Sequence, residues 1–269
     1  MERPKPPVKW AGGKGQLIPQ FEPLFPKEKF DLYLEPFVGG GAVFFHLLPE
    51  RAILIDSNPE LVNFYRVVRD SLPELCADLA KHKNDREYYY RTRALDPETL
   101  SPVERASRFL YLNKTGYNGL WRVNRKGKHN VPFGRYKNPK ILDEENLRLV
   151  SLALMRAEIV CGNFSLVLEY ACPRAFVYLD PPYNPLSDTA NFTGYTADSF
   201  GKEDQERLAE VFRKLDAKGC MVMLSNSDTP LVRELYAGYD IRVVRARRAI
   251  NCRADRRGPV SELVIRNYR

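Results

Sequence analysis

FDLYLEPFVGGGAVFFHLLPERAILID, residues 30–56, says more about the fold of this chain than any other segment. Residues 30–35 predict a short strand that the glycine run 39–41 breaks, and a helix is predicted over 42–48. A second apolar strand, 52–55, ends at Asp56. This order is typical of the start of a doubly wound parallel sheet: a strand, a glycine turn, a helix, and a second strand that ends in an acidic residue.

The sheet pattern resumes in the second half of the chain. Apolar strands are predicted over residues 158–161, 175–179 and 220–224, and the last is expected to end at Ser225-Asn226-Ser227. An amphipathic helix is predicted over 202–218. Two β-rich runs, 239–246 and 260–268, follow it, joined by a basic turn that contains Arg247, Arg248, Arg253, Arg256 and Arg257.

Residues 57–143 interrupt this pattern. They are helical and charge-rich to about Thr115, and the stretch 116–140 is rich in Gly, Asn, Arg, Lys and aromatic residues. The predicted fold is therefore α/β: a doubly wound, Rossmann-like sheet domain built from residues 1–56 and 144–269. An inserted, mainly helical domain occupies 57–143 and carries a β-hairpin at about 117–137.

Composition narrows the classes of function. The 269 residues carry a net charge of +8, with a pI near 9.2, which favours a polyanionic partner such as nucleic acid. Three scattered histidines and five cysteines without a CxxC pair predict neither a metal site nor disulfides. No apolar run could span a membrane and no secretory signal begins the chain, so a cytoplasmic, monomeric protein is expected.

The glycine run predicts a nucleoside site. Glycines at the end of a strand let the backbone approach a ligand, and Asp56 can hold the hydroxyls of a ribose. A dinucleotide motif would need a third glycine where Phe44 stands, and a P-loop fails because Gly15 follows Lys14. A tight turn without a ligand is the alternative. S-adenosylmethionine fits best once the next motif is considered.

Asp180-Pro181-Pro182-Tyr183 follows the strand at 175–179 directly. An aromatic amine is a poor nucleophile, because its lone pair is delocalised into the ring. The Asp180 carboxylate and the Pro181 carbonyl could accept its two hydrogens, and the fixed φ of two prolines would hold that carbonyl still. Tyr183 offers a face for a flipped base. The alternative is a rigid turn with no chemical role.

Residues 117–137 combine basic and aromatic side chains around the polar turn 125–128. This pattern indicates a β-hairpin in which arginine could recognise guanine, asparagine could recognise adenine, and an apolar residue could wedge between bases. An exposed hairpin with no nucleic-acid contact is the alternative.

Together these motifs resemble the DNA adenine methylase (Dam) family over nearly the whole chain. Residues 9–14 (KWAGGK) resemble its N-terminal cofactor motif, 35–44 its glycine loop, 180–183 its catalytic motif and 117–137 its recognition hairpin. The resemblance implies N6 methylation of adenine in duplex DNA, by base flipping and direct in-line transfer from S-adenosylmethionine, most simply within GATC.

The resemblance also implies roles for particular residues. Catalysis is expected from Asp180, Pro181, Pro182 and Tyr183. The cofactor site is expected to include Trp10, Lys14, Phe37, Gly39, Gly41, Asp56, Asn163, Phe164 and Asp180. Bases would be contacted by Lys9, Leu120, Arg122 and Pro132, with Tyr117 intercalating, and the DNA backbone by Asn118, Asn124, Arg135 and Lys137. Asn163 stands where the family often has Asp, and its amide oxygen can still accept from the adenine amine of the cofactor.

Two rival interpretations remain at this stage. Related Pro-Pro-Tyr motifs serve other planar amines, so cytosine N4 or an amine in structured RNA is the second enzyme hypothesis. A DNA-binding protein that has lost its chemistry is the third, against which Asp56 and Asp180 argue.

Overall fold

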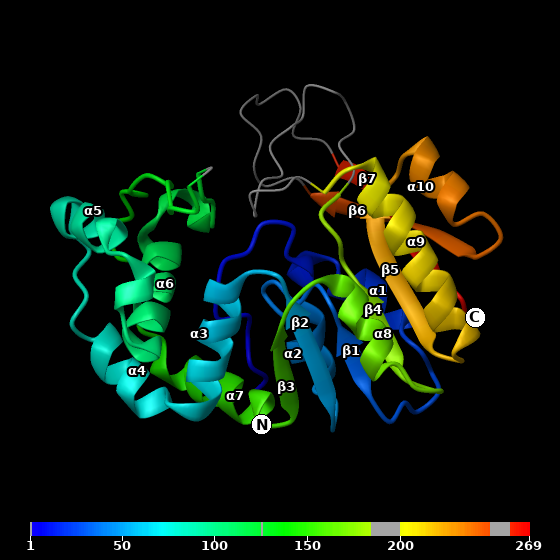
Figure 1. The fold of residues 1–269 in the computed structure, drawn as a ribbon, viewed down its shortest axis with the longest axis horizontal. Helices are drawn as coiled ribbons and strands as arrows, with labels where there is room; N and C mark the ends of the chain where they lie inside the picture. The colour runs from blue at the N-terminus through cyan, green and yellow to red at the C-terminus, as the bar shows by residue number, and fades with distance from the viewer. Residues whose placement is uncertain (1, 125, 184–199, 248–258) are drawn as a thin grey trace.

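The computed structural model describes residues 2–124, 126–183, 200–247 and 259–269. Within them a seven-stranded sheet has the order β3-β2-β1-β4-β5-β7-β6 (Figure 1). The strands are β1 (Tyr33–Glu35), β2 (Ala52–Asp56), β3 (Ala157–Cys161), β4 (Phe176–Leu179), β5 (Met221–Ser227), β6 (Asp240–Arg247) and β7 (Pro259–Arg266). The pairs from β3 to β5 are parallel, whereas β7 is antiparallel to both of its neighbours. The predicted doubly wound sheet is thus present, mostly parallel.

Helices cover both faces of the sheet and form a separate layer beside it. The α-helices are α1 (Ile18–Phe21), α2 (Ala42–Leu47), α3 (Pro59–Asp70), α4 (Leu72–Leu79), α5 (Arg86–Ala94), α6 (Pro102–Thr115), α7 (Glu144–Leu154), α8 (Val167–Tyr170), α9 (Lys202–Ala217) and α10 (Pro230–Leu235). Short 3-10 helices are η1 (Lys14–Gln16), η2 (Glu22–Leu24), η3 (Pro97–Thr99), η4 (Tyr117–Gly119) and η5 (Phe164–Leu166).

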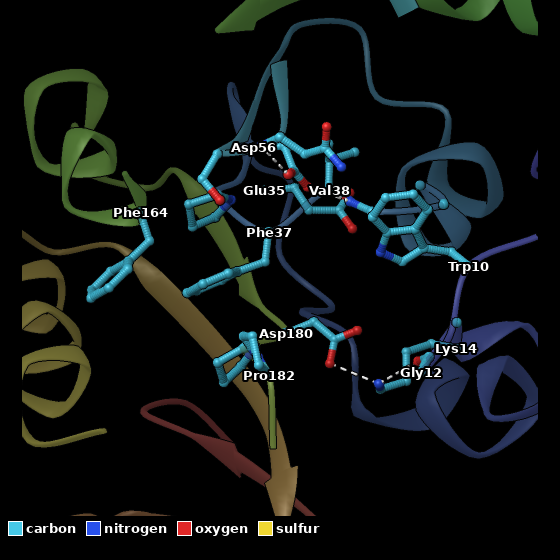
Figure 2. Close-up of a pocket in the computed structure, with 18 of the residues that line it drawn as sticks. Trp10, Gly12, Lys14, Glu35, Phe37, Val38, Asp56, Phe164, Asp180 and Pro182 are labelled. Carbon is cyan, nitrogen blue, oxygen red and sulfur yellow. Dashed lines mark hydrogen bonds and ion pairs between the residues drawn. The ribbon is translucent and has the colours of Figure 1, made fainter. Parts of the chain in front are cut away.

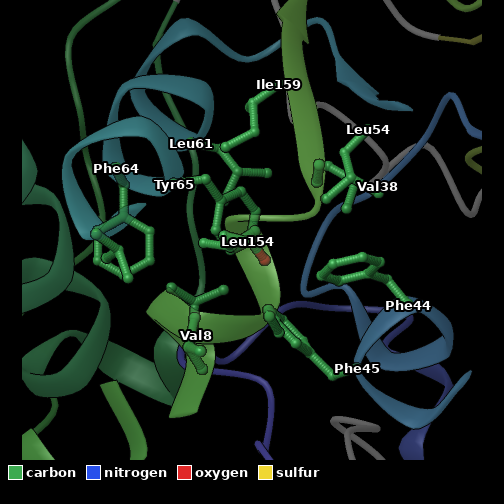
Figure 3. Packing of buried hydrophobic residues seen from close by; sticks show 14 of the residues in the cluster. Val8, Val38, Phe44, Phe45, Leu54, Leu61, Phe64, Tyr65, Leu154 and Ile159 are labelled. Carbon is green, nitrogen blue, oxygen red and sulfur yellow. The ribbon is translucent and has the colours of Figure 1, made fainter. Parts of the chain in front are cut away.

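Successive side chains of each strand point to opposite faces of the sheet, and each face has its own hydrophobic core. Leu34 and Ile53 belong to a cluster with residues of α8, α9 and α10, whereas Tyr33 and Leu54 belong to a cluster with α2, α3 and α6. Figure 3 shows part of the second cluster, where Leu54 lies near the side chains of α2 and α3. Because both faces are covered, the strands are almost continuously apolar.

The helices α3 to α7 form a lobe on one side of the sheet, on the left of Figure 1. Asn58 begins α3 by accepting hydrogen bonds from the backbone of Glu60 and Leu61, with Pro59 in the first turn. A capping box of Ser101 and Glu104 begins α6, which packs against α3, α4 and α5. The charge-rich stretch that the sequence predicts as helical is therefore helical, with breaks at Ser71, between Leu79 and Arg86, and between Ala94 and Pro102.

Side chains from helices satisfy backbone groups at both edges of the sheet. At the β3 edge, the Arg66 and Arg69 guanidinium groups of α3 donate to the carbonyls of Ile159 and Ala157. At the β6 edge, the side-chain amide of Gln20 pairs with both the N–H and the carbonyl of Arg245, each at 3.0 Å. These edge groups are hydrogen-bonded within the chain.

Several predicted strand boundaries differ from the structure by one to three residues. β1 begins at Tyr33, three residues later than predicted. The strand predicted over 220–224, with its end at Ser225-Asn226-Ser227, includes this polar run: β5 continues through Ser227, since β7 pairs with Ser225, Asn226 and Ser227. Within the described part of the predicted hairpin, the two arms meet at isolated bridges, Gly116 with Phe133 and Val123 with His129. The basic turn and the loop after Tyr183 fall largely on residues 248–258 and 184–199, outside the described residues.

Candidate active site

Two loops meet at the carboxyl edge of the sheet, where its strand order reverses. The glycine loop follows β1 and the Asp-Pro-Pro-Tyr segment follows β4, and β1 and β4 are neighbours. Ligands of doubly wound sheets bind at such a switch point. A cavity of about 810 Å³ opens there, and all the residues predicted for catalysis or cofactor binding line it. Figure 2 labels Trp10, Lys14, Phe37, Asp56, Phe164, Asp180 and Pro182 among them.

Asp180 is held by a lysine and a serine. The Lys14 ammonium lies 2.7 Å from its Oδ1, which also accepts a hydrogen bond from Ser225 Oγ at 2.9 Å. Lys14 is 4% exposed and donates as well to the Gly12 carbonyl at 2.6 Å. Burial raises the pKa of Asp180, and the Lys14 charge opposes that rise. The carboxylate is therefore charge-paired inside the cavity, pointing toward Lys14 in Figure 2.

Tyr183 is fixed at both of its ends. Its hydroxyl donates to Glu262 Oε2 on β7 at 2.6 Å, and the Lys14 ammonium lies 4.6 Å from its ring centroid. Burial raises the pKa of the phenol well above its usual value. One face of the ring is thus occupied by Lys14, and the segment after β4 is tied to the antiparallel end of the sheet.

Asp56 joins the glycine loop to α3. One carboxylate oxygen accepts from the Gly39 N–H at 3.0 Å and the other from the Asn58 N–H at 2.9 Å, while burial raises its pKa. Gly39 has φ +47°, and a Cβ there would lie 2.7 Å from the Trp10 indole. The glycine is required because its backbone packs directly against Trp10.

An aromatic group forms another wall of the cavity. Phe37 and Phe164 stack with ring centroids 5.3 Å apart, and Phe200 contacts both rings. The neighbouring Asn163 begins η5, and its Oδ1 accepts from the backbone N–H and the hydroxyl of Ser165. The amide oxygen that the sequence suggests for a cofactor amine is therefore already engaged by two donors of the chain.

The residues predicted to contact DNA gather around η4 and the loop that follows it. Tyr117 is 53% exposed, an unusual exposure for a large aromatic side chain. The other exposed members of the set are Lys9, Arg122, Asn124, Pro132, Arg135 and Lys137, and Asn118 and Leu120 are half-buried. Trp121 and His129 pack on the inside of the loop. The loop thus exposes its basic residues and Tyr117, and it buries Trp121 and His129.

A family model described as D12 class N6 adenine-specific DNA methyltransferase matches residues 10–250. The chain belongs to this family. It is 45% identical to the type II methyltransferase M.MjaIII of Methanocaldococcus jannaschii, covering 98% of this chain and 99% of that one. It is 44% identical to the type II methyltransferase M1.LlaDCHI of Lactococcus lactis subsp. cremoris (98% and 95%) and 40% identical to the DNA adenine methylase of Escherichia coli strain K12 (96% and 93%).

As a D12 class adenine methyltransferase, the protein is an enzyme that acts on DNA and methylates adenine N6. This membership favours adenine N6 over the rival hypotheses. Those were methylation of cytosine N4, methylation of an amine in structured RNA, and a DNA-binding protein that has lost catalytic activity. The family reaction implies S-adenosylmethionine as the methyl donor. Among the described helices, none is both long and apolar enough to cross a membrane. The described residues include no cluster of His, Cys, Asp and Glu suited to a metal ion.

Sequence reasoning missed several residues of this D12 methyltransferase site. Ser225 bonds Asp180 from 45 residues away in the sequence, and Glu262 bonds Tyr183 from 79 residues away. Glu35 lines the cavity at 2% exposure, accepts a hydrogen bond from the Tyr33 hydroxyl at 2.9 Å, and has its pKa raised well above the usual value by burial. Glu35 is the first residue of the glycine segment 35–44. The signal that could have identified it is a charged residue at the end of an apolar strand.

Proposed function

We propose that this methyltransferase modifies adenine within GATC in duplex DNA, after the base has been flipped out of the helix. The observation that carries the proposal is the meeting of Asp180, Tyr183 and the glycine loop in one cavity. In a base-flipping enzyme the target must leave the stack, because chemistry cannot reach the amine within the duplex. A cavity at the edge of the sheet suits an extruded base.

The residues that line the cavity fit S-adenosylmethionine. Asp56 offers carboxylate oxygens for ribose hydroxyls, the Phe37 and Phe164 rings offer apolar surface for the adenine, and the glycine loop leaves the backbone open. We assign Trp10, Lys14 and Asp180 to the methionine side of this site. The cofactor, when bound, supplies an electrophilic methyl group on a sulfonium.

The chain contributes positioning and charge to the reaction. Asp180 and the Pro181 carbonyl would accept the two hydrogens of the adenine amine, which directs its lone pair away from the ring plane. The Lys14 charge opposes the rise in the pKa of Asp180 that burial causes, and so favours the ionised carboxylate. Glu262 holds the Tyr183 ring in place, so that a base can stack against it. In this proposal, positioning and charge complementarity would let a weak nucleophile react without a dedicated base.

We infer that the helical segment 57–143 is the target-recognition unit. Its loop presents Tyr117, Arg122 and Lys137 outward, and Lys9 lies beside it with its ammonium 4.2 Å from the Tyr136 ring centroid. Exposed cations bind phosphates, and an exposed aromatic can enter the base stack. The Arg122 Nε donates to Asn130 Oδ1 at 2.7 Å, which orients the guanidinium for a bidentate contact.

Methyl transfer to defined duplexes tests the proposal. Labelled S-adenosylmethionine is supplied with duplexes that carry GATC or differ from it by one base pair, and the products are digested to nucleosides. Label in N6-methyladenine, with kcat/KM far higher on GATC, is expected. Equal rates on duplexes with and without GATC would refute the proposed target while leaving the adenine chemistry in place.

Replacing Asp56 with alanine should weaken S-adenosylmethionine binding by about 1–3 kcal/mol, the cost of losing hydrogen bonds to a charged group. Titration calorimetry measures this. Asp56→Asn is the matched control, because an amide oxygen can still accept from the Gly39 N–H that the carboxylate holds. Unchanged affinity in a folded Asp56→Ala protein would remove this residue from the cofactor site.

Replacing Lys14 with methionine should move the acid limb of the pH–rate profile to higher pH. Burial raises the pKa of Asp180 and Lys14 lowers it, so loss of Lys14 leaves the rise unopposed. Asp180 would then be protonated at a higher pH, and it would lose its negative charge and one acceptor site there. Single-turnover rates at saturating cofactor measure the shift, with the exposed Lys202→Met as the control. If the acid limb does not move, ionisation of Asp180 does not control the rate of methyl transfer.

A further inference from the structure

A buried asparagine lies at the junction of the N-terminal segment, α6 and η4. Asn113 is 0% exposed. Its Oδ1 accepts from the Lys9 N–H at 2.9 Å, and its Nδ2 donates to the Lys9 carbonyl at 2.7 Å and to the Gly119 carbonyl at 3.0 Å. Both donors and the acceptor of the amide are therefore used on backbone groups of two other segments.

Each of these segments leads directly to a functional surface. Lys9 precedes Trp10, whose indole packs against the glycine loop of the catalytic cavity. Gly119 ends η4, which carries Tyr117 and Asn118, and has φ +62°. A Cβ on Gly119 would lie 2.4 Å from Lys9 Cδ and 2.5 Å from Lys9 Cβ. The Gly119 backbone is thus packed directly against the Lys9 side chain, at the point where Asn113 bonds both segments.

We propose that Asn113 is a positioning residue that fixes where the 117–137 loop lies relative to the cavity that contains Asp180. The proposal rests on the assignment of the 117–137 loop to target recognition. A loop shifted along the N-terminal segment would deliver the base away from Asp180 even when DNA is bound. Displacements of about 1 Å can cost on the order of 100-fold in rate.

The chain offers a matched control in Asn146 of α7. Its Oδ1 accepts from the Lys5 N–H at 2.8 Å, and its Nδ2 donates to the Lys5 carbonyl at 3.0 Å. The bonding pattern is the same as that of Asn113 with Lys9, on the same N-terminal segment, which Figure 1 draws in dark blue beside the helical lobe. Asn146 bonds Lys5 alone in this way, so its loss should loosen the segment without shifting the loop.

The experiment compares Asn113→Ala and Asn146→Ala with the unaltered enzyme. The sequence that the unaltered enzyme prefers is determined first, so that an error in GATC is detected separately. The kcat/KM for that sequence is then divided by the kcat/KM for duplexes changed at one base pair. Anisotropy titrations without cofactor give the same ratio for binding. Asn113→Ala should lower kcat on the preferred duplex by about 10- to 100-fold and reduce the discrimination ratios at least tenfold. Asn146→Ala should keep both within threefold.

Gly119→Ala tests the same junction without altering Asn113, in case the alanine variant does not fold. The added methyl group must push Lys9 and η4 apart, so the same loss of kcat and of discrimination is expected. Circular dichroism and thermal melting establish that each variant is folded. If folded variants at both positions lose activity equally on every duplex, or match Asn146→Ala, the positioning role is wrong.

Discussion

Replacing Asp180 with alanine is expected to reduce methyl transfer at least about 100-fold, the usual scale for removing a group that stabilises the reacting centre. In the structure this carboxylate is the partner of the Lys14 ammonium at 2.7 Å and of the Ser225 hydroxyl at 2.9 Å. Its loss removes an acceptor for the amine and leaves the lysine charge uncompensated inside the cavity. Single-turnover rates with saturating DNA and cofactor measure the effect.

Two comparisons make the Asp180 result specific. Asp180→Asn retains one acceptor oxygen without the charge, so it should keep more activity than the alanine variant if hydrogen-bond geometry dominates. Affinity for DNA should persist in both variants, because the exposed cations of the 117–137 loop are untouched. A folded Asp180→Ala enzyme that kept more than a tenth of the single-turnover rate would show that the amine does not depend on this carboxylate.

Replacing Arg122 with alanine should cost about 1–3 kcal/mol on the preferred duplex and relax discrimination at one base pair. The resemblance suggests that this pair contains the guanine opposite the last base of GATC. Asn130 accepts from the Arg122 Nε at 2.7 Å, so the guanidinium is oriented before DNA binds. The measurement is kcat/KM on duplexes changed at one position at a time.

Lys137→Ala is the control for Arg122, since both residues are exposed cations on the same loop. A phosphate contact carries no sequence information, so Lys137→Ala should weaken binding to all duplexes alike and lower the salt dependence by about one charge. If Arg122→Ala also loses activity equally on every duplex, Arg122 anchors the DNA and another residue recognises the guanine.

Local motifs predicted which residues meet in the cavity because these residues stand where strands end. The glycine loop and Asp180 follow β1 and β4, and the carboxyl ends of neighbouring parallel strands meet at one edge of the sheet. Lys14 was predicted from the family resemblance, and the structure adds its ion pair with Asp180.

Residues whose roles depend on strand pairing were not predictable in the same way. Ser225 belongs to a polar run that suggested the end of β5, yet β7 pairs with it and buries it. Glu262 reaches Tyr183 from β7, 79 residues away. The predicted hairpin is irregular because Asn118, Gly119 and Arg135 adopt positive φ, which interrupts a regular ladder. Hydrophobic alternation indicates neither the partner of a strand nor such local turns.

The hydrogen-bonded edges of the sheet bear on how the protein behaves when it is concentrated. A free strand edge is a template on which a second molecule can add its own strand, the first step toward fibrous aggregates. Arg66 and Arg69 occupy outward carbonyls of β3, and Gln20 occupies both outward groups of Arg245 on β6. Strand addition at these positions would first have to break bonds within the chain. Three side chains thereby shield both edges of a large apolar sheet. Two of them are positively charged, so they also repel the same edge of a second molecule.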